Sequence, residues 1–311
     1  MARPILLPRR RALIAASGAP LLLTARGAFA GVRVRDARGQ EIEIRDASRI
    51  VAVGGSVTEV IYALGGEKSL VATDSTSLFP VAARKTPKVG YMRTLSAEGV
   101  LSLRPSLVIT TTAAGPESAL RQIADAGVAV LVLSDDYSFD AVVAKIEGIG
   151  RALGLAQAAT DLARKVRADM ADVAARVAQS KTKPRALSFL TFGQGGAPQA
   201  AGRMTAADGI IRLAGGVNVF DAWTGYKPMT PEATVAAAPE VIMVGTQTIE
   251  AIGGVDKILA DPALALTPAA KNRRVASADA LLLLGFGPRT PEAVRIVARV
   301  FHPDVEFPAA R

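Results

Sequence analysis

The chain of 311 residues contains no cysteine and a single histidine, His302. The absence of cysteine excludes disulfide bonds, thiolate chemistry and lipid attachment through an N-terminal cysteine. One histidine is too few for a histidine-rich zinc or manganese site. A Ser-His-Asp triad would have to use His302, but the G-x-S-x-G motif that would support one does not occur. The sequence therefore predicts a protein that is not an enzyme.

Long apolar runs are also missing, since no stretch of 18 or more apolar residues occurs, and no membrane-spanning helix is expected. Residues 1–30 instead resemble a secretory signal peptide, with arginines at 9–11, a short apolar stretch and Ala28-Phe29-Ala30 as a cleavage site. Arg10 and Arg11 also fit a twin-arginine signal, and Sec export stays open. We expect cleavage after Ala30 and a periplasmic location.

Strong charge is absent once this signal is removed. Residues 1–30 hold five arginines and no acid, so the net charge falls from +9 to +4, with 32 basic and 28 acidic residues remaining. No clustered basic patch is visible, so we predict that the protein does not bind nucleic acid. A weak positive charge fits a small anionic ligand equally well.

A repeated pattern is the most informative feature that the chain does contain. Residues 96–109 (SAEGVLSLRPSLVI) match residues 230–243 (TPEATVAAAPEVIM) at an offset of 134. In each copy a serine or threonine caps a short helix, a glutamate follows in its first turn, and a proline precedes a buried strand. The offset is one domain length, so the simplest inference is two similar α/β lobes with a cleft between them.

The rest of the chain supports this organisation. Strands and helices alternate on both sides of a long amphipathic stretch, Leu155 to Val177, which is long enough to cross between lobes. The sequence predicts an α/β fold of two Rossmann-like lobes with parallel sheets, joined by a long helix. The expected parts are a signal peptide (1–30), an N-terminal lobe (31–153), a connecting helix (154–180) and a C-terminal lobe (181–311).

Seven local motifs resemble the haem-binding proteins of bacterial haem importers, which are periplasmic binding proteins of class III, the rigid, helix-linked type. They are residues 53–59 (VGGSVTE), 74–80 (DSTSLFP), 88–93 (KVGYMR), 95–100 (LSAEGV), 201–208 (AGRMTAAD), 225–228 (GYKP) and 284–290 (LGFGPRT). The resemblance covers about residues 48–302. It implies capture of haem, or a related tetrapyrrole, in the cleft and delivery to an ABC permease, with no catalytic cofactor. We expect the protein to be a monomer.

One departure from the family concerns the iron ligand. The resemblance implies a tyrosine just before the proline of the 74–80 motif, whose phenolate would bind haem iron. This chain has Phe79 there, and Gln194 lies in a glycine-rich loop where some relatives have histidine. Three explanations stay open. Haem binds by burial and salt links with Phe79 stacking on it; another residue is the ligand (Tyr91, Met92, Met204 or Tyr226); or the ligand is an iron-free tetrapyrrole, a corrinoid or a ferric siderophore.

The resemblance also implies charged contacts. We expect Arg93, Arg203, Lys227 and Arg289 in loops that face the cleft, where they would hold the haem propionates. In related proteins one exposed acid on each lobe docks on the permease, and Glu59 and Asp208 are the residues we predict for this role. An exported α/β enzyme is the alternative from another class, but the chain offers neither a nucleophile with a base nor a metal cluster.

Overall fold

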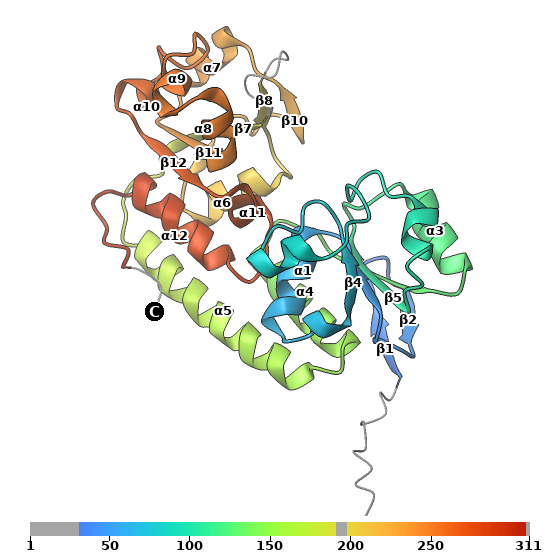
Figure 1. Cartoon of the computed structure of the whole chain (residues 1–311). Coiled ribbons are helices and arrows are strands. Elements are labelled where there is room, and N and C mark those ends of the chain that lie inside the picture. The colour runs from blue at the N-terminus through green and yellow to red at the C-terminus, as the bar shows by residue number, and fades with distance from the viewer. Residues whose placement is uncertain (1–30, 191–197, 309–311) are drawn as a thin grey trace, which may run out of the picture.

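The computed structural model describes residues 31–190 and 198–308 and contains two α/β lobes (Figure 1). The predicted signal peptide lies outside these residues. The N-terminal lobe has a parallel sheet of order β4-β3-β5-β6, and an antiparallel hairpin of β1 and β2 packs beside it. The strands are β1 (Val32–Arg35), β2 (Glu41–Ile44), β3 (Ile50–Ala52), β4 (Leu70–Thr73), β5 (Leu107–Thr111) and β6 (Ala129–Leu133).

Helices cover both faces of this sheet, so its central strands are fully buried, as expected of a parallel sheet. The α-helices are α1 (Gly55–Ala63), α2 (Ala97–Leu101), α3 (Glu117–Asp125) and α4 (Phe139–Ala152). Two short 3-10 helices, Glu67–Ser69 and Val81–Lys85, flank β4.

The C-terminal lobe has a mixed sheet of order β10-β8-β7-β11-β12, with β9 also pairing with β7. β7, β9, β11 and β12 are parallel to one another. At one edge of the sheet β8 pairs antiparallel with β7, and β10 pairs antiparallel with β8. The sequence predicts parallel sheets only, so these antiparallel pairs differ from the expectation. The strands are β7 (Arg185–Leu190), β8 (Gln199–Ala201), β9 (Val217–Asn218), β10 (Tyr226–Pro228), β11 (Val241–Gly245) and β12 (Val275–Ala278). The helices are α6 (Ala206–Leu213), α7 (Pro231–Ala237), α8 (Thr246–Ile252), α9 (Val255–Leu259), α10 (Pro268–Lys271), α11 (Ala280–Leu284) and α12 (Thr290–Phe301).

The repeated pattern forms the same unit in both lobes. The Ser96 hydroxyl accepts a hydrogen bond from the Gly99 amide and caps α2, after which β5 enters the middle of its sheet. The Thr230 hydroxyl accepts from the Ala233 amide and caps α7, after which β11 enters its sheet between β7 and β12. The predicted caps, helices and strands are confirmed, because hydroxyl caps and the helix-stopping prolines act locally.

The long helix α5 (Ala156–Val177) runs along one side of the molecule and packs on α4 of the first lobe and α12 of the second (Figure 1). Its 22 residues span roughly 33 Å. The buried face presents Ala159, Ala163, Val166, Met170 and Val173 to a hydrophobic core that continues through both lobes. The fold class is therefore confirmed, while the lobe boundaries at 153/154 and 180/181 stay a prediction. Within residues 31–190 and 198–308, no helix is both long and apolar enough to cross a membrane.

Candidate binding site in the interlobe cleft

A cavity of about 550 Å³ lies between the lobes and is lined by residues of both. In the N-terminal lobe the lining residues follow the carboxyl ends of the four parallel strands, where open α/β sheets bind their ligands. This wall is formed by Gly54, Gly55, Ser56, Ser75, Thr76, Leu78, Tyr91, Met92, Arg93, Thr111, Ala113, Asp135 and Tyr137. The opposite wall is formed by Leu190, Ala206, Tyr226, Ala280, Leu281, Leu284 and Gly285.

The two walls differ in chemistry. The N-terminal wall carries the hydroxyls and both charged groups, Arg93 and Asp135, whereas the C-terminal wall is apolar except for the phenol of Tyr226 and backbone groups. In the part of the chain that the structure describes, no hydrogen bond or ion pair engages the Arg93 side chain. The cleft therefore offers an apolar surface on one side and a free guanidinium on the other.

The loop after β4 is pinned by one buried carboxylate. Asp74 accepts hydrogen bonds from the Gly54 amide (3.0 Å), the Thr76 amide (3.0 Å) and the hydroxyls of Thr76 (2.6 Å) and Ser77 (2.7 Å). The Lys88 ammonium donates to the Ser77 carbonyl from the other side. The Asp-Ser-Thr-Ser sequence therefore forms a rigid loop that presents Ser75 and Thr76 to the cavity, because carboxylate hydrogen bonds to N–H and O–H groups are among the stronger ones.

Four of the predicted ligand-binding residues lie together on the cavity wall: Tyr91, Met92, Arg93 and Tyr226. Burial raises the pKa of the Tyr226 phenol to about 12, with a smaller raising effect from Tyr137 and a lowering effect from Arg93. The Tyr226 phenol, which also has a hydrogen bond with Thr205, is therefore neutral near neutral pH. Gln194, which was also predicted, lies outside the described residues.

Other predicted ligand-binding residues do not line this cavity. Arg203 lines a second cavity of about 360 Å³ in the C-terminal lobe, together with Lys183 and Arg212. Met204 is 74% exposed, and the Lys227 ammonium lies 5.8 Å from the centre of the Trp223 ring. Contrary to the expectation, Arg203 lines this second cavity and not the cleft cavity.

Phe79 and Arg289 contact each other rather than the cavity. The Arg289 guanidinium lies 3.5 Å from the centre of the Phe79 ring and donates to both oxygens of Glu59, at 3.0 and 2.9 Å. Its charge is thus satisfied by a carboxylate and an aromatic face. The expectation that Arg289 is available to a propionate is not met in this structure.

The two predicted docking acids are buried, which corrects the expectation that they are exposed. Glu59 is 5% exposed and paired with Arg289 across the lobes. Asp208 is 2% exposed and paired with Arg212 at 2.9 Å. A buried carboxylate that already has an arginine partner cannot present its charge to another protein. Glu59 on α1 and Asp208 on α6 lie on the buried sides of their helices. The position of an acid along a helix does not show which side it faces, so the sequence alone could not reveal this burial.

Sequence reasoning missed Asp135 and Tyr137 on the cavity wall and the lobes' exposed acids. Asp135 and Tyr137 follow β6, and their position after a strand end was a signal that could have found them. Glu98 and Glu232 are exposed and occupy the same place in the two copies of the repeat. The repeat itself was the signal for this pair. His302 is fully buried, with Nε2 2.8 Å from the Ala214 carbonyl, and does not line the cleft cavity.

Comparison with known proteins gives a family match and a similar solved structure. The family described as periplasmic binding protein matches residues 50–281. The structure of a periplasmic heme-binding protein, RhuT of Roseiflexus sp. RS-1 in apo form, is 41% identical with a TM-score of 0.78, covering 83% of this chain and 99% of that one.

Two curated relatives extend the comparison. An uncharacterized ABC transporter substrate-binding lipoprotein, YvrC of Bacillus subtilis (strain 168), is 29% identical over 88% of this chain and 86% of its own length. A vitamin B12-binding protein of Yersinia pestis (strain Pestoides F) is 28% identical over 65% of this chain and 71% of its own length. On the family match and the fold, this chain belongs to the periplasmic binding protein family.

Proposed function

We propose that this protein is the substrate-binding component of a haem ABC importer, which captures haem in the interlobe cleft and delivers it to a membrane permease. The observation that carries the proposal is the cleft itself: one apolar wall faces one wall with a free guanidinium, Arg93. A volume of about 550 Å³ is typical of small-molecule sites. The similarity to a structure described as a periplasmic heme-binding protein supports the same ligand.

Haem matches both walls. A porphyrin offers several hundred Å² of apolar surface, so burial at about 25 cal/mol per Å² contributes several kcal/mol. Its propionates match Arg93, because guanidinium binds carboxylate in a bidentate manner. Tyr91, Met92 and Tyr226 are the iron ligands that the cavity offers, and Phe79 has no lone pair to donate.

The proposal includes export and delivery. Residues 1–30 would serve as a Sec or twin-arginine signal, cleaved after Ala30, and the mature protein would act as a periplasmic monomer. The core shared by both lobes favours small movements on ligand binding rather than a wide hinge closure.

The direct test is titration of the purified mature protein with hemin, followed by visible absorption. We expect a shifted Soret band that saturates near one equivalent. An unchanged spectrum at micromolar protein would reject haem as the ligand. Iron-free protoporphyrin, titrated in parallel, shows whether iron coordination contributes to affinity.

The second candidate ligand is a corrinoid, which the similarity to a vitamin B12-binding protein favours. Competition decides between the two. If cobalamin displaces hemin at equal concentration, or binds where hemin does not, the corrinoid is the better assignment. A ferric siderophore or an exported enzyme activity has no specific observation in its favour.

Delivery requires contact with the permease, and we propose Glu98 and Glu232 as the docking acids. They are exposed and equivalently placed, one on each lobe. The double variant Glu98→Gln/Glu232→Gln is expected to weaken binding to the permease in lipid nanodiscs by roughly 100-fold or more, because each of the two charge-assisted contacts contributes about 1.5–3 kcal/mol. Hemin affinity should be unchanged.

The matched control for this prediction is Glu117→Gln, which removes an exposed acid from the first turn of α3, outside the repeat. This variant should bind the permease like the unmodified protein. If the control loses as much affinity for the permease as the double variant, the effect is due to net charge alone. Glu98 and Glu232 would then be rejected as docking groups.

A further inference from the structure

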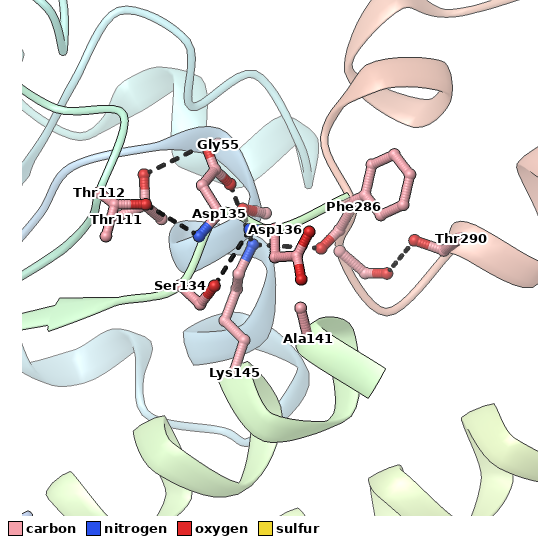
Figure 2. A network of polar contacts seen from close by, with 12 residues as sticks. Gly55, Thr111, Thr112, Ser134, Asp135, Asp136, Ala141, Lys145, Phe286 and Thr290 are labelled. Atoms are coloured by element: carbon pink, nitrogen blue, oxygen red, sulfur yellow. Dashed lines mark hydrogen bonds and ion pairs between the residues drawn. The ribbon is translucent and has the colours of Figure 1, made fainter. Parts of the chain in front are cut away.

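A largely buried polar cluster joins the two lobes, and Figure 2 shows the part of it around Asp135, Lys145 and Phe286. We call it the interlobe polar cluster and define it by Ser56, Glu59, Asp135, Lys145, Phe286 and Arg289. It contains two connections across the lobes. One is the Glu59–Arg289 ion pair, and the other is a hydrogen bond from the Lys145 ammonium to the Phe286 carbonyl at 3.3 Å.

Lys145 is the centre of the second connection. It projects from α4 and its side chain is only 2% exposed. Its ammonium lies 3.0 Å from the Ser56 hydroxyl, 3.3 Å from the Phe286 carbonyl and 3.5 Å from a carboxylate oxygen of Asp135. An ammonium has three protons, so these three acceptors match its full donor capacity. Burial lowers the pKa of Lys145, and the carboxylates of Asp135 and Glu59 oppose this effect.

The three acceptors belong to different parts of the molecule. Ser56 and Asp135 both line the cleft cavity in the N-terminal lobe, whereas Phe286 belongs to the segment between α11 and α12 in the C-terminal lobe. Figure 2 shows Lys145 rising from α4 between Asp135 on one side and Phe286 on the other. One buried cation thus contacts two groups of the ligand cavity and the backbone of the opposite lobe.

Phe286 is held in the geometry that this contact needs. Its φ of 49° is in the left-handed region, where a residue other than glycine costs about 1–2 kcal/mol. Its ring is fully buried and packs on Tyr137 of the N-terminal lobe, with 5.5 Å between ring centres. Tyr137 also lines the cavity, so the backbone and the ring of Phe286 both touch residues next to the ligand.

We propose that Lys145 is a positioning residue of the binding cleft. It does not line the cavity, but it fixes Ser56 and Asp135 relative to the C-terminal lobe and so sets the width of the cleft. The physical reason is that a buried ammonium is stable only with its acceptors in place. If the lobes move apart at Phe286, the Lys145 ammonium loses one of its acceptors. The free-energy cost of that loss keeps the empty cleft in the binding geometry. The proposal rests on the proposed function in one respect, namely that the ligand binds in this cleft.

The first test measures lobe geometry without any ligand. Because the chain has no cysteine, Ser118→Cys on α3 and Glu250→Cys on α8 give two unique spin-label sites, one exposed position on each lobe. Pulsed electron paramagnetic resonance then reports the interlobe distance distribution. We expect one narrow distribution for the otherwise unmodified protein and a distribution at least about twice as broad for Lys145→Met.

The second test measures hemin affinity. Lys145→Met is expected to raise the dissociation constant of hemin at least about tenfold, which corresponds to about 1.4 kcal/mol. The matched control is Lys165→Met, which removes an exposed lysine that pairs with Asp169 on α5. This control should change neither the distance distribution nor the affinity. A residue that only stabilises the fold would lower the melting temperature of Lys145→Met without affecting either readout.

Each outcome decides the proposal. A folded Lys145→Met protein with an unchanged distance distribution and unchanged affinity overturns it. If Lys145→Met does not fold, the double variant Lys145→Met/Asp135→Asn removes both charges and leaves no unpaired ion, and its distance distribution decides instead. If the protein without the Lys145 substitution does not bind hemin, the proposed function fails, while the distance distribution still decides whether Lys145 positions the lobes.

Discussion

Replacing Arg289 with methionine is expected to destabilise the protein by about 3–5 kcal/mol, the cost of leaving one partner of a buried ion pair alone. Glu59 is 5% exposed, and the Arg289 guanidinium is its ion-pair partner across the lobes. Without that partner the carboxylate stays buried beside Gly287, with no ion-pair partner of its own. Urea unfolding followed by circular dichroism gives the free energy of unfolding.

Two further variants make this prediction specific. Glu59→Gln/Arg289→Met removes both charges and should recover most of the lost stability, because no unpaired ion remains. Arg273→Met breaks the ion pair between Arg273 and Asp256, whose side chains are 66% and 83% exposed. This substitution should lower the free energy of unfolding by less than about 1 kcal/mol, because exposed ion pairs contribute little. If Arg289→Met is no more destabilising than Arg273→Met, the interlobe ion pair does not stabilise the fold.

Replacing Arg93 with methionine is expected to weaken hemin binding by about 10- to 100-fold. The guanidinium is the one cation on the cavity wall in the described part of the chain, and no protein group competes for it there. A hydrogen-bonded contact to a charged group contributes about 1.5–3 kcal/mol, which gives the stated range. Methionine keeps the apolar stem of the side chain, so the loss of hemin affinity measures the contribution of the charge.

Arg203→Met is the matched control, because Arg203 belongs to a sequence motif of the same kind but lines the other cavity. Its hemin affinity should stay within about twofold of the unmodified protein. Both variants are measured by the same Soret titration. If Arg203→Met weakens binding as much as Arg93→Met, the propionates do not lie where the cleft cavity places them.

Local features of the fold could be predicted from the sequence. The caps at Ser96 and Thr230 depend on hydroxyls a few residues from the groups they bind, and the apolar face of α5 depends on a spacing of three or four. Such features were predicted correctly because the residues that decide them are neighbours in the chain.

Features of the site that depend on distant partners could not be predicted. Glu59 and Arg289 are 230 residues apart in sequence, and only their meeting explains why the Glu59 carboxylate is buried. Lys145 reads as a solvated charge on an amphipathic helix until Asp135 and the Phe286 carbonyl are placed beside it. A motif shows that a residue matters to a family, but the side of the lobe that it faces is decided by packing.

The core that α5 shares with α12 also bears on how the chain folds. α12 ends at Phe301, close to the end of the chain, and its buried face completes the same hydrophobic cluster that begins at Val34. Folding therefore depends on contacts between residues far apart in the sequence, because one hydrophobic cluster contains residues of both lobes. We expect the two lobes to unfold in a single cooperative transition, despite their separate sheets. A fragment that ends before Thr290 would keep the packing of α5 on α4 but expose the part of α5 that packs on α12, so we expect it to be less stable than the whole protein.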